Sequence, residues 1–137
     1  MDASTRTKLL EAARLAARHA YAPYSNFPVG AAVLTADGSV FSGSNIENAS
    51  YGLTICAERS AVAAAVSAGH REIVAVAVSA PRLPRASPCG ACRQVLNEFR
   101  PANGGLTVML DDRQNGVDTS IEELLPQAFG PNNLSSG

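Results

Sequence analysis

The sequence of 137 residues lacks the features that mark several classes of protein. No stretch approaches the roughly 20 apolar residues that a membrane-spanning helix needs, so we expect no membrane span. The amino terminus, MDASTRTK, is polar and has no apolar signal core, which predicts a cytoplasmic protein. The net charge is −1 and no basic run stands out among the 11 Lys and Arg residues, which argues against a nucleic-acid partner.

Cysteine is scarce and odd in number, with Cys56, Cys89 and Cys92 as the whole set. An odd count in a chain without a signal segment disfavours a disulfide framework and favours metal or redox chemistry. The composition, 46% hydrophobic and 17% charged, is that of a folded globular protein. With no internal repeat or linker, we expect one domain over residues 1–137, with a flexible tail from about residue 131.

Apolar periodicity predicts helices and strands in alternating order. The first helix, over residues 4–21, carries Leu9, Leu10, Ala13, Ala16, Ala17, Ala20 and Tyr21 on one apolar arc. Strands are expected at 29–35, 40–44, 72–80 and 106–112. Further helices are expected at about 55–68 with Thr54 as N-cap, at 89–100, and as a short segment after Thr119 that ends at Pro126. This alternation predicts an α/β fold in which helices cover the sheet.

The cysteines have the spacing of a metal site. Cys89 and Cys92 are three residues apart at a predicted helix start, so one ion can bridge them, and Cys56 begins another helix. Both helices follow a strand and a loop, which places both starts at one edge of the sheet. The positive helix ends would stabilise the thiolates. Structural zinc sites have four protein ligands. His70 lies 14 residues beyond Cys56 and His19 lies on the polar arc of the first helix, so neither is expected to supply a fourth ligand. We therefore expect an open, catalytic site.

Two charged residues accompany Cys56. Glu58 follows it by two positions, so both side chains can flank an ion beyond the helix end, where a carboxylate can move protons. Carboxylates also occur at helix starts simply because they favour the dipole. Arg59 lies on the face of Cys56 and is expected to hydrogen-bond the ligand sulfurs; the alternative is an ordinary surface arginine.

Two long motifs resemble a known family. NIENASYGLTICAERSA at 45–61 and PCGACRQVLNEF at 88–99 resemble the small, zinc-dependent cytidine deaminases of the homotetrameric kind. The resemblance extends from YAPYSNFPVGAAV at 21–33 to LLPQAFG at 124–130. It implies a three-layer α/β/α fold with a mixed five-stranded sheet, one Zn²⁺ per subunit, a homotetramer with active sites near subunit interfaces, and a role in pyrimidine salvage.

The resemblance also implies residue roles. Cys56, Cys89 and Cys92 become the zinc ligands, and Glu58 becomes the proton shuttle while hydroxide on zinc attacks C4 of the pyrimidine. Arg59 matches the arginine that neutralises the thiolates. The implied substrate-binding residues are Phe27, Asn45, Ile46, Glu47 and Ala57, together with Tyr51 and Phe129 near a neighbouring subunit's active site.

Some of these residues have a second interpretation. Asn45 and Glu47 lie two apart in an extended segment, so both side chains can face a vicinal diol. Equally, such side chains commonly cap loops by bonding to nearby backbone. By themselves, Phe27 and Phe129 would be assigned to the core.

Three other functions compete with deamination of free cytidine and 2′-deoxycytidine. A related enzyme could act on another cytosine nucleoside, such as a nucleoside antibiotic. Editing of a polynucleotide would need a basic groove, which the sequence does not predict. A structural zinc domain or non-catalytic binding module is opposed by the missing fourth ligand and by Glu58.

Overall fold

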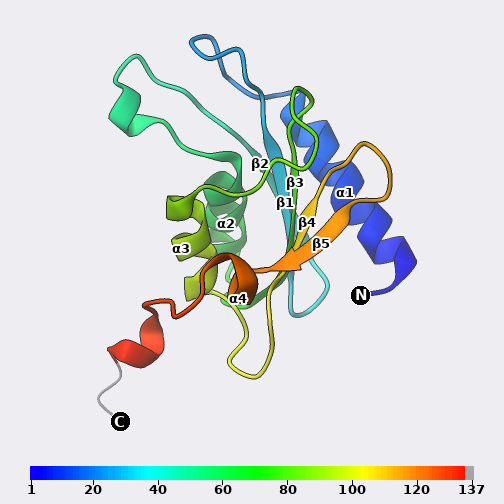
Figure 1. Ribbon diagram of the computed structural model, residues 1–137, viewed down its shortest axis with the longest axis vertical. Helices are drawn as coiled ribbons and strands as arrows, with labels where there is room; N and C mark the ends of the chain where they lie inside the picture. The colour runs from blue at the N-terminus through cyan, green and yellow to red at the C-terminus, as the bar shows by residue number, and fades with distance from the viewer. Residues whose placement is uncertain (135–137) are drawn as a thin grey trace.

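The computed structural model describes residues 1–134, and Figure 1 shows a central sheet between helices. The chain alternates strands and helices as expected, with two short 3₁₀ helices in addition. In chain order the elements are α1 (Ala3–Ala17), β1 (Gly30–Thr35), β2 (Val40–Ser44), η1 (Tyr51–Leu53), α2 (Ala57–Ser67), β3 (Ile73–Ser79), α3 (Gly90–Glu98), β4 (Thr107–Leu110), β5 (Val117–Ser120), α4 (Ile121–Leu124) and η2 (Pro131–Asn133).

The sheet is mixed, with the strand order β2-β1-β3-β4-β5. β1 is antiparallel to both β2 and β3, β3 is parallel to β4, and β4 is antiparallel to β5. α1 covers one face, whereas α2 and α3 cover the other (Figure 1). The predicted three-layer α/β/α fold with a mixed five-stranded sheet is therefore confirmed.

β1 connects the two halves of the core because it is buried along its whole length. Successive side chains of a strand point to opposite faces. Accordingly, Ala31 and Val33 pack in the cluster that includes α2, and Ala32 and Leu34 pack against α1. At Gly30, an added Cβ would lie 2.0 Å from the carbonyl oxygen of Ala13, so glycine is what lets α1 approach β1 this closely.

The first helix is shorter than predicted. It starts at the N-cap Asp2, whose carboxylate accepts a hydrogen bond from the Thr5 amide, and it ends at Ala17 rather than at residue 21. Ala20 and Tyr21 lie beyond it because the backbone of Tyr21 pairs with Asn45 and Glu47. The apolar arc is otherwise correct, since Leu9, Leu10, Ala13, Ala16 and Ala17 are buried.

Pattern analysis missed one strand and misplaced two helix caps. β5 has four residues and pairs with β4 at the edge of the sheet. Because Thr119 belongs to this strand, α4 is capped by Ser120, whose hydroxyl accepts a hydrogen bond from the Glu123 amide. α2 begins two residues later than expected, with Cys56 rather than Thr54 as its N-cap.

Within residues 1–134, no helix combines the length and the apolar character needed to cross a membrane. Part of the predicted tail, Pro131–Asn133, forms a short 3₁₀ helix. Residues 135–137 lie outside the described part of the chain.

Candidate metal centre

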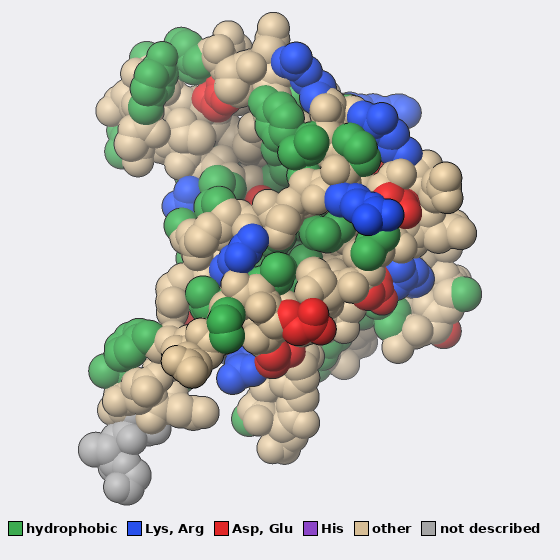
Figure 2. All heavy atoms as spheres, in the orientation of Figure 1, with side chains coloured by type: hydrophobic (Ala, Val, Ile, Leu, Met, Phe, Trp, Pro, Cys, Tyr) green, Lys and Arg blue, Asp and Glu red, His purple; other side chains and the backbone are tan. Residues whose placement is uncertain are grey.

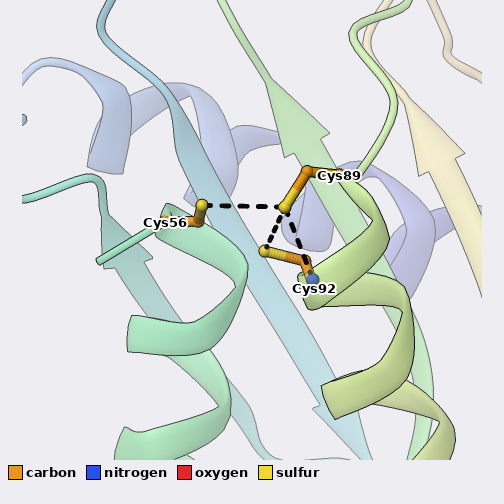
Figure 3. A group of neighbouring side chains, drawn as sticks. All are labelled: Cys56, Cys89 and Cys92. Atoms are coloured by element: carbon orange, nitrogen blue, oxygen red, sulfur yellow. Dashed lines mark hydrogen bonds between the residues drawn. The ribbon is translucent and has the colours of Figure 1, made fainter. Parts of the chain in front are cut away.

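Two helix starts meet at one edge of the sheet. β2 and β3 run in the same direction because both are antiparallel to β1, so the loops that follow them leave from the same edge. The first loop leads to Cys56 and the second to Cys89, and each cysteine is the extended N-cap of its helix. Cys92 lies in the first turn of α3. The three side chains converge between α2 and α3 (Figure 3).

The sulfur atoms have the spacing that a tetrahedral ion requires. The Sγ atoms of Cys56 and Cys89 are 3.9 Å apart, and those of Cys89 and Cys92 are 3.4 Å apart. All three lie within 4.8 Å of one another. Tetrahedral zinc with Zn–S bonds of about 2.3 Å places its sulfur ligands about 3.8 Å apart. The three thiols therefore fit zinc without rearrangement of the helices.

The ligand group that the described residues form consists of these three cysteines and includes neither histidine. His70 lies beside Asp37, with 3.7 Å between its Nδ1 and a carboxylate oxygen, and its ring packs on Phe41. His19 is exposed at the end of the first helical segment.

The thiols are electrostatically unequal. The hydrogen bond from Cys92, with those from Arg59 and Cys89, lowers the pKa of Cys56 to about 5 in spite of its partial burial. The same bond with Cys56, together with burial, raises the pKa of Cys92. Arg59 Nη2 lies 3.5 Å from the Cys56 sulfur and 3.4 Å from the Thr54 carbonyl oxygen. Cys56 therefore ionises more readily than Cys92, and it has a cation beside it.

Glu58 is buried although it belongs to the first turn of α2, where only 5% of it is exposed. Burial raises the pKa of its carboxyl group, and the negative charge of Cys56 raises it further. It lines a pocket of about 250 Å³ together with Cys56 and Cys89. A carboxyl group with raised proton affinity is thus held beside the cysteine cluster.

The predicted substrate-binding residues divide into three groups. Phe27, Asn45 and Ala57 line the pocket with Glu58. Glu47 and Tyr51 line an adjacent pocket of about 410 Å³, which shares Thr54 with the first. Ile46 and Phe129 line neither.

Asn45 and Glu47 are engaged with the backbone of their own chain. Asn45 accepts a hydrogen bond from the Val29 amide and donates one to the Phe27 carbonyl oxygen. Glu47 accepts from the amides of Tyr24 and Ser25 and from the Ser25 hydroxyl. The loop-capping interpretation thus describes the observed contacts, while one amide hydrogen of Asn45 has no hydrogen bond in the described structure. Binding of ribose remains a prediction.

Tyr51 and Phe129 project outward, with 74% and 59% of each residue exposed. The carbonyl oxygen of Phe129 accepts hydrogen bonds from Gln94 and Asn97 of α3, so its backbone is fixed while its ring is exposed. Their roles at a neighbouring subunit stay predictions.

Several pocket residues had not been predicted. Ala86 and Ser87 directly precede the PC motif, and this adjacency was a usable signal. The sequence held no comparable signal for Leu83, because long-range hydrogen bonds fold its loop over the site. The remaining unpredicted lining residues are Val29, Thr54 and Val78.

Comparison with known proteins places this site in a family. Residues 3–104 match the model of the cytidine and deoxycytidylate deaminase zinc-binding region, a span that includes all three cysteines and Glu58. The chain belongs to the cytidine and deoxycytidylate deaminase family. For this deaminase family member, the zinc-binding description and the sulfur spacing together indicate zinc as the ion.

Several relatives of this deaminase match over nearly their whole length. The cytidine deaminase of Sporosarcina psychrophila is 47% identical over 129 residues, which cover 93% of each chain. That of Halalkalibacterium halodurans is 51% identical over 125 residues, covering 90% of this chain and 93% of the relative. The crystal structure of cytidine deaminase from Burkholderia pseudomallei superposes with a TM-score of 0.82 at 50% identity, covering 90% of this chain and 98% of that one.

Proposed function

We propose that this protein hydrolyses free cytidine and 2′-deoxycytidine to uridine and 2′-deoxyuridine, with release of ammonia, in cytoplasmic pyrimidine salvage. In this reaction a C4–O bond forms from water and the C4–N bond to the amino group breaks. The observation that carries the proposal is a cluster of three thiols, two of which line one pocket together with the buried carboxyl group of Glu58. The relatives named above are cytidine deaminases that match nearly the whole chain.

Cys56, Cys89 and Cys92 would hold one zinc ion per subunit. When bound, zinc lowers the pKa of water and so supplies a hydroxide nucleophile at neutral pH. Glu58 would accept the proton that water loses and deliver it to ring N3, where uridine keeps it. It would then carry the proton of the new C4 hydroxyl group to the departing amine. Its burial excludes bulk water, which would otherwise exchange these protons.

The pocket suits an uncharged nucleoside better than a nucleotide. Its lining contains no Lys, Arg or His side chain, and its one carboxyl group is that of Glu58. The adjacent pocket brings a second carboxylate, Glu47. A 5′-phosphate would find no cation there to offset its loss of water. We therefore expect cytidine and deoxycytidine to be preferred over deoxycytidylate.

A polynucleotide fits the surface of this protein less well than a free nucleoside fits the pocket. On the face in Figure 2, Lys and Arg side chains form separate groups, with Asp and Glu side chains between them. Three arginines, Arg6, Arg14 and Arg100, are in ion pairs with acidic partners. This face offers no continuous basic groove for a backbone of phosphates.

The decisive experiment combines metal analysis with an ultraviolet assay of cytidine loss. We expect about one zinc per chain in the wild type, and Glu58→Gln should retain that zinc but lose at least about 100-fold in kcat. Glu11→Gln, which removes an exposed carboxylate from α1 on the opposite face of the sheet, is the matched control. Full turnover by Glu58→Gln would remove Glu58 from the mechanism, and Cys89→Ala that kept its zinc would remove Cys89 from the ligand set.

Substrate choice is tested by competition among cytidine, deoxycytidine, deoxycytidylate and a cytosine-bearing nucleoside antibiotic. The proposal requires the highest kcat/KM for the first two. Faster turnover of deoxycytidylate, or of the antibiotic with cytidine untouched, would contradict it.

We further propose that the single domain of residues 1–137 assembles into a homotetramer with Tyr51 and Phe129 near neighbouring active sites. Tyr51, Leu53 and Phe129 are large apolar side chains with most of their surface exposed, as expected for surfaces that a partner covers. Light scattering should give four times the chain mass of 14.2 kDa. A monomer that is fully active would contradict the proposal.

A further inference from the structure

Two loops form walls of the substrate pocket. Phe27 belongs to the segment before β1, and Leu83, Ala86 and Ser87 belong to the segment after β3. At the sheet these segments are joined by β1–β3 pairing, which ends at Gly30 opposite Ser79. Both loops extend beyond this end of the paired strands, at the top of the molecule in Figure 1. The parts of the pocket lining that these two loops supply therefore lie outside the hydrogen-bonded sheet.

One side chain connects the two loops beyond the sheet. Arg82 Nη1 donates a hydrogen bond of 2.7 Å to the carbonyl oxygen of Asn26. Each partner is the direct neighbour of a wall residue, since Asn26 precedes Phe27 and Arg82 precedes Leu83. Over the part of the chain that the structure describes, no other hydrogen bond links residues 21–29 to residues 80–88.

Each loop has separate anchors on its own side. The segment after β3 is held by two hydrogen bonds. The Arg113 guanidinium donates to the Pro81 carbonyl oxygen, and the Arg85 amide donates to the Asp111 carbonyl oxygen. The segment before β1 is held by Asn45, which donates to the Phe27 carbonyl oxygen. Loss of the Arg82 bond would thus leave both loops folded but no longer joined.

We propose that Arg82 is a positioning residue for substrate binding, whose guanidinium straps the Phe27 loop to the Leu83 loop and sets the width of the pocket. The proposal rests on the function proposed above. Glu58 and the cysteines belong to α2, α3 and their N-caps, and Arg82 bonds to Asn26 and not to them, so loss of the strap should weaken binding in the ground state and the transition state alike. Such uniform binding appears in KM and leaves kcat unchanged.

The test compares Arg82→Met with Arg85→Met. Both arginines are exposed in the same loop, but the Arg85 guanidinium makes no hydrogen bond within the described structure. The variants therefore share the loss of charge and differ in the loss of the strap. For Arg82→Met we expect KM for cytidine to rise about fivefold, the effect of one charge-assisted hydrogen bond at a surface, with kcat within about twofold of the wild type. Arg85→Met should match the wild type.

Two further measurements separate the strap from the activity. In the Glu58→Gln background, calorimetry with cytidine should show the same fivefold loss of affinity for Arg82→Met. Without any nucleoside, hydrogen exchange at the amides of Phe27, Leu83 and Arg85 should accelerate in Arg82→Met but not in Arg85→Met.

Unchanged exchange and affinity in Arg82→Met would overturn the proposal. So would a fall in kcat at constant KM, or faster exchange with no loss of affinity. If the wild type neither binds nor deaminates cytidine, the proposed function fails, and the exchange comparison still decides whether the strap exists.

Discussion

At the scale of single residues, Arg59 tests how the metal site controls its charge. Its Nη2 lies 3.5 Å from the Cys56 sulfur, and this contact is among the causes that lower the pKa of that thiol. Side chains that hydrogen-bond metal ligands commonly account for a 10–100-fold effect on affinity. We predict that Arg59→Leu lowers zinc affinity by about that factor, as measured by competition with a chromogenic chelator.

Arg71→Leu is the control for this measurement. Arg71 lies beyond the other end of α2 and donates to the carbonyl oxygens of Val66 and His70, far along the chain from the cysteines. Equal zinc affinity in the two variants would show that the contact of Arg59 with Cys56 does not contribute to metal binding.

The predicted site residues that the structure brings together are those whose chemistry is unusual for their position. Three thiols at helix starts and a carboxyl group beside one of them have little purpose in a plain helix. The partners of Asn45 and Glu47 were not predictable, because they lie 16–23 residues earlier in the chain and depend on how the loops fold together. The strap at Arg82 spans 56 residues and left no local pattern.

At the scale of elements, the contact between α1 and β1 depends on Gly30. A Cβ at this position would lie 2.0 Å from the Ala13 carbonyl oxygen and 2.3 Å from the Ala17 amide nitrogen. Because both atoms are backbone, α1 would have to move away from the sheet. We predict that Gly30→Ala lowers the free energy of unfolding by about 3 kcal/mol, as measured by urea denaturation.

Gly52→Ala provides the matched control, since nothing lies within 4 Å of its added Cβ and its backbone conformation needs no glycine. It should change stability by less than about 0.5 kcal/mol. A similar loss in both variants would mean that the effect comes from the unfolded chain and not from the contact with α1.

Elements differed in how far their sequence determined them. β3 was predicted at 72–80 and lies at Ile73–Ser79, because a central strand buried on both faces needs an unbroken apolar run. β5 was missed because it is a four-residue edge strand with Val117 as its one apolar residue, and its pairing with β4 is a tertiary event. The resemblance to a family, not the residue pattern, supplied the fifth strand.

At the scale of the whole molecule, Asp111 connects α1 to the ends of two strands. Arg14 donates two hydrogen bonds to its carboxylate, at 3.0 and 2.8 Å, and the Ser79 hydroxyl donates a third at 2.7 Å. Burial by itself would raise the pKa of Asp111, but these bonds, with one from the Arg113 amide, outweigh burial and lower the pKa to about 2. The ionised form of Asp111 is therefore more stable in the folded state than in the unfolded state.

This difference predicts a pH-dependent contribution to stability. A group whose folded pKa is depressed stabilises the fold above its unfolded pKa, near 3.8 here, and the contribution is lost as pH falls through about 2. We expect Asp111→Asn to be less stable than the wild type by about 2 kcal/mol at pH 5, a difference that shrinks towards pH 2. Urea denaturation of both proteins across this range measures it.

Acid also protonates the cysteines, but it does so in both proteins, so their difference isolates Asp111. If the difference in the free energy of unfolding between the two proteins stayed constant from pH 5 to pH 2, the stabilisation would come from side-chain packing and not from the charge of Asp111.

The order in which the cysteines occur along the chain has a consequence for maturation. Cys56 and Cys89 are separated by 33 positions, and β3 lies between them. A growing polypeptide that has exposed α2 offers a single sulfur, and the other two arrive together on one helical turn. The complete three-sulfur site therefore exists only where α3 has docked against α2, so zinc binding by all three ligands depends on that contact.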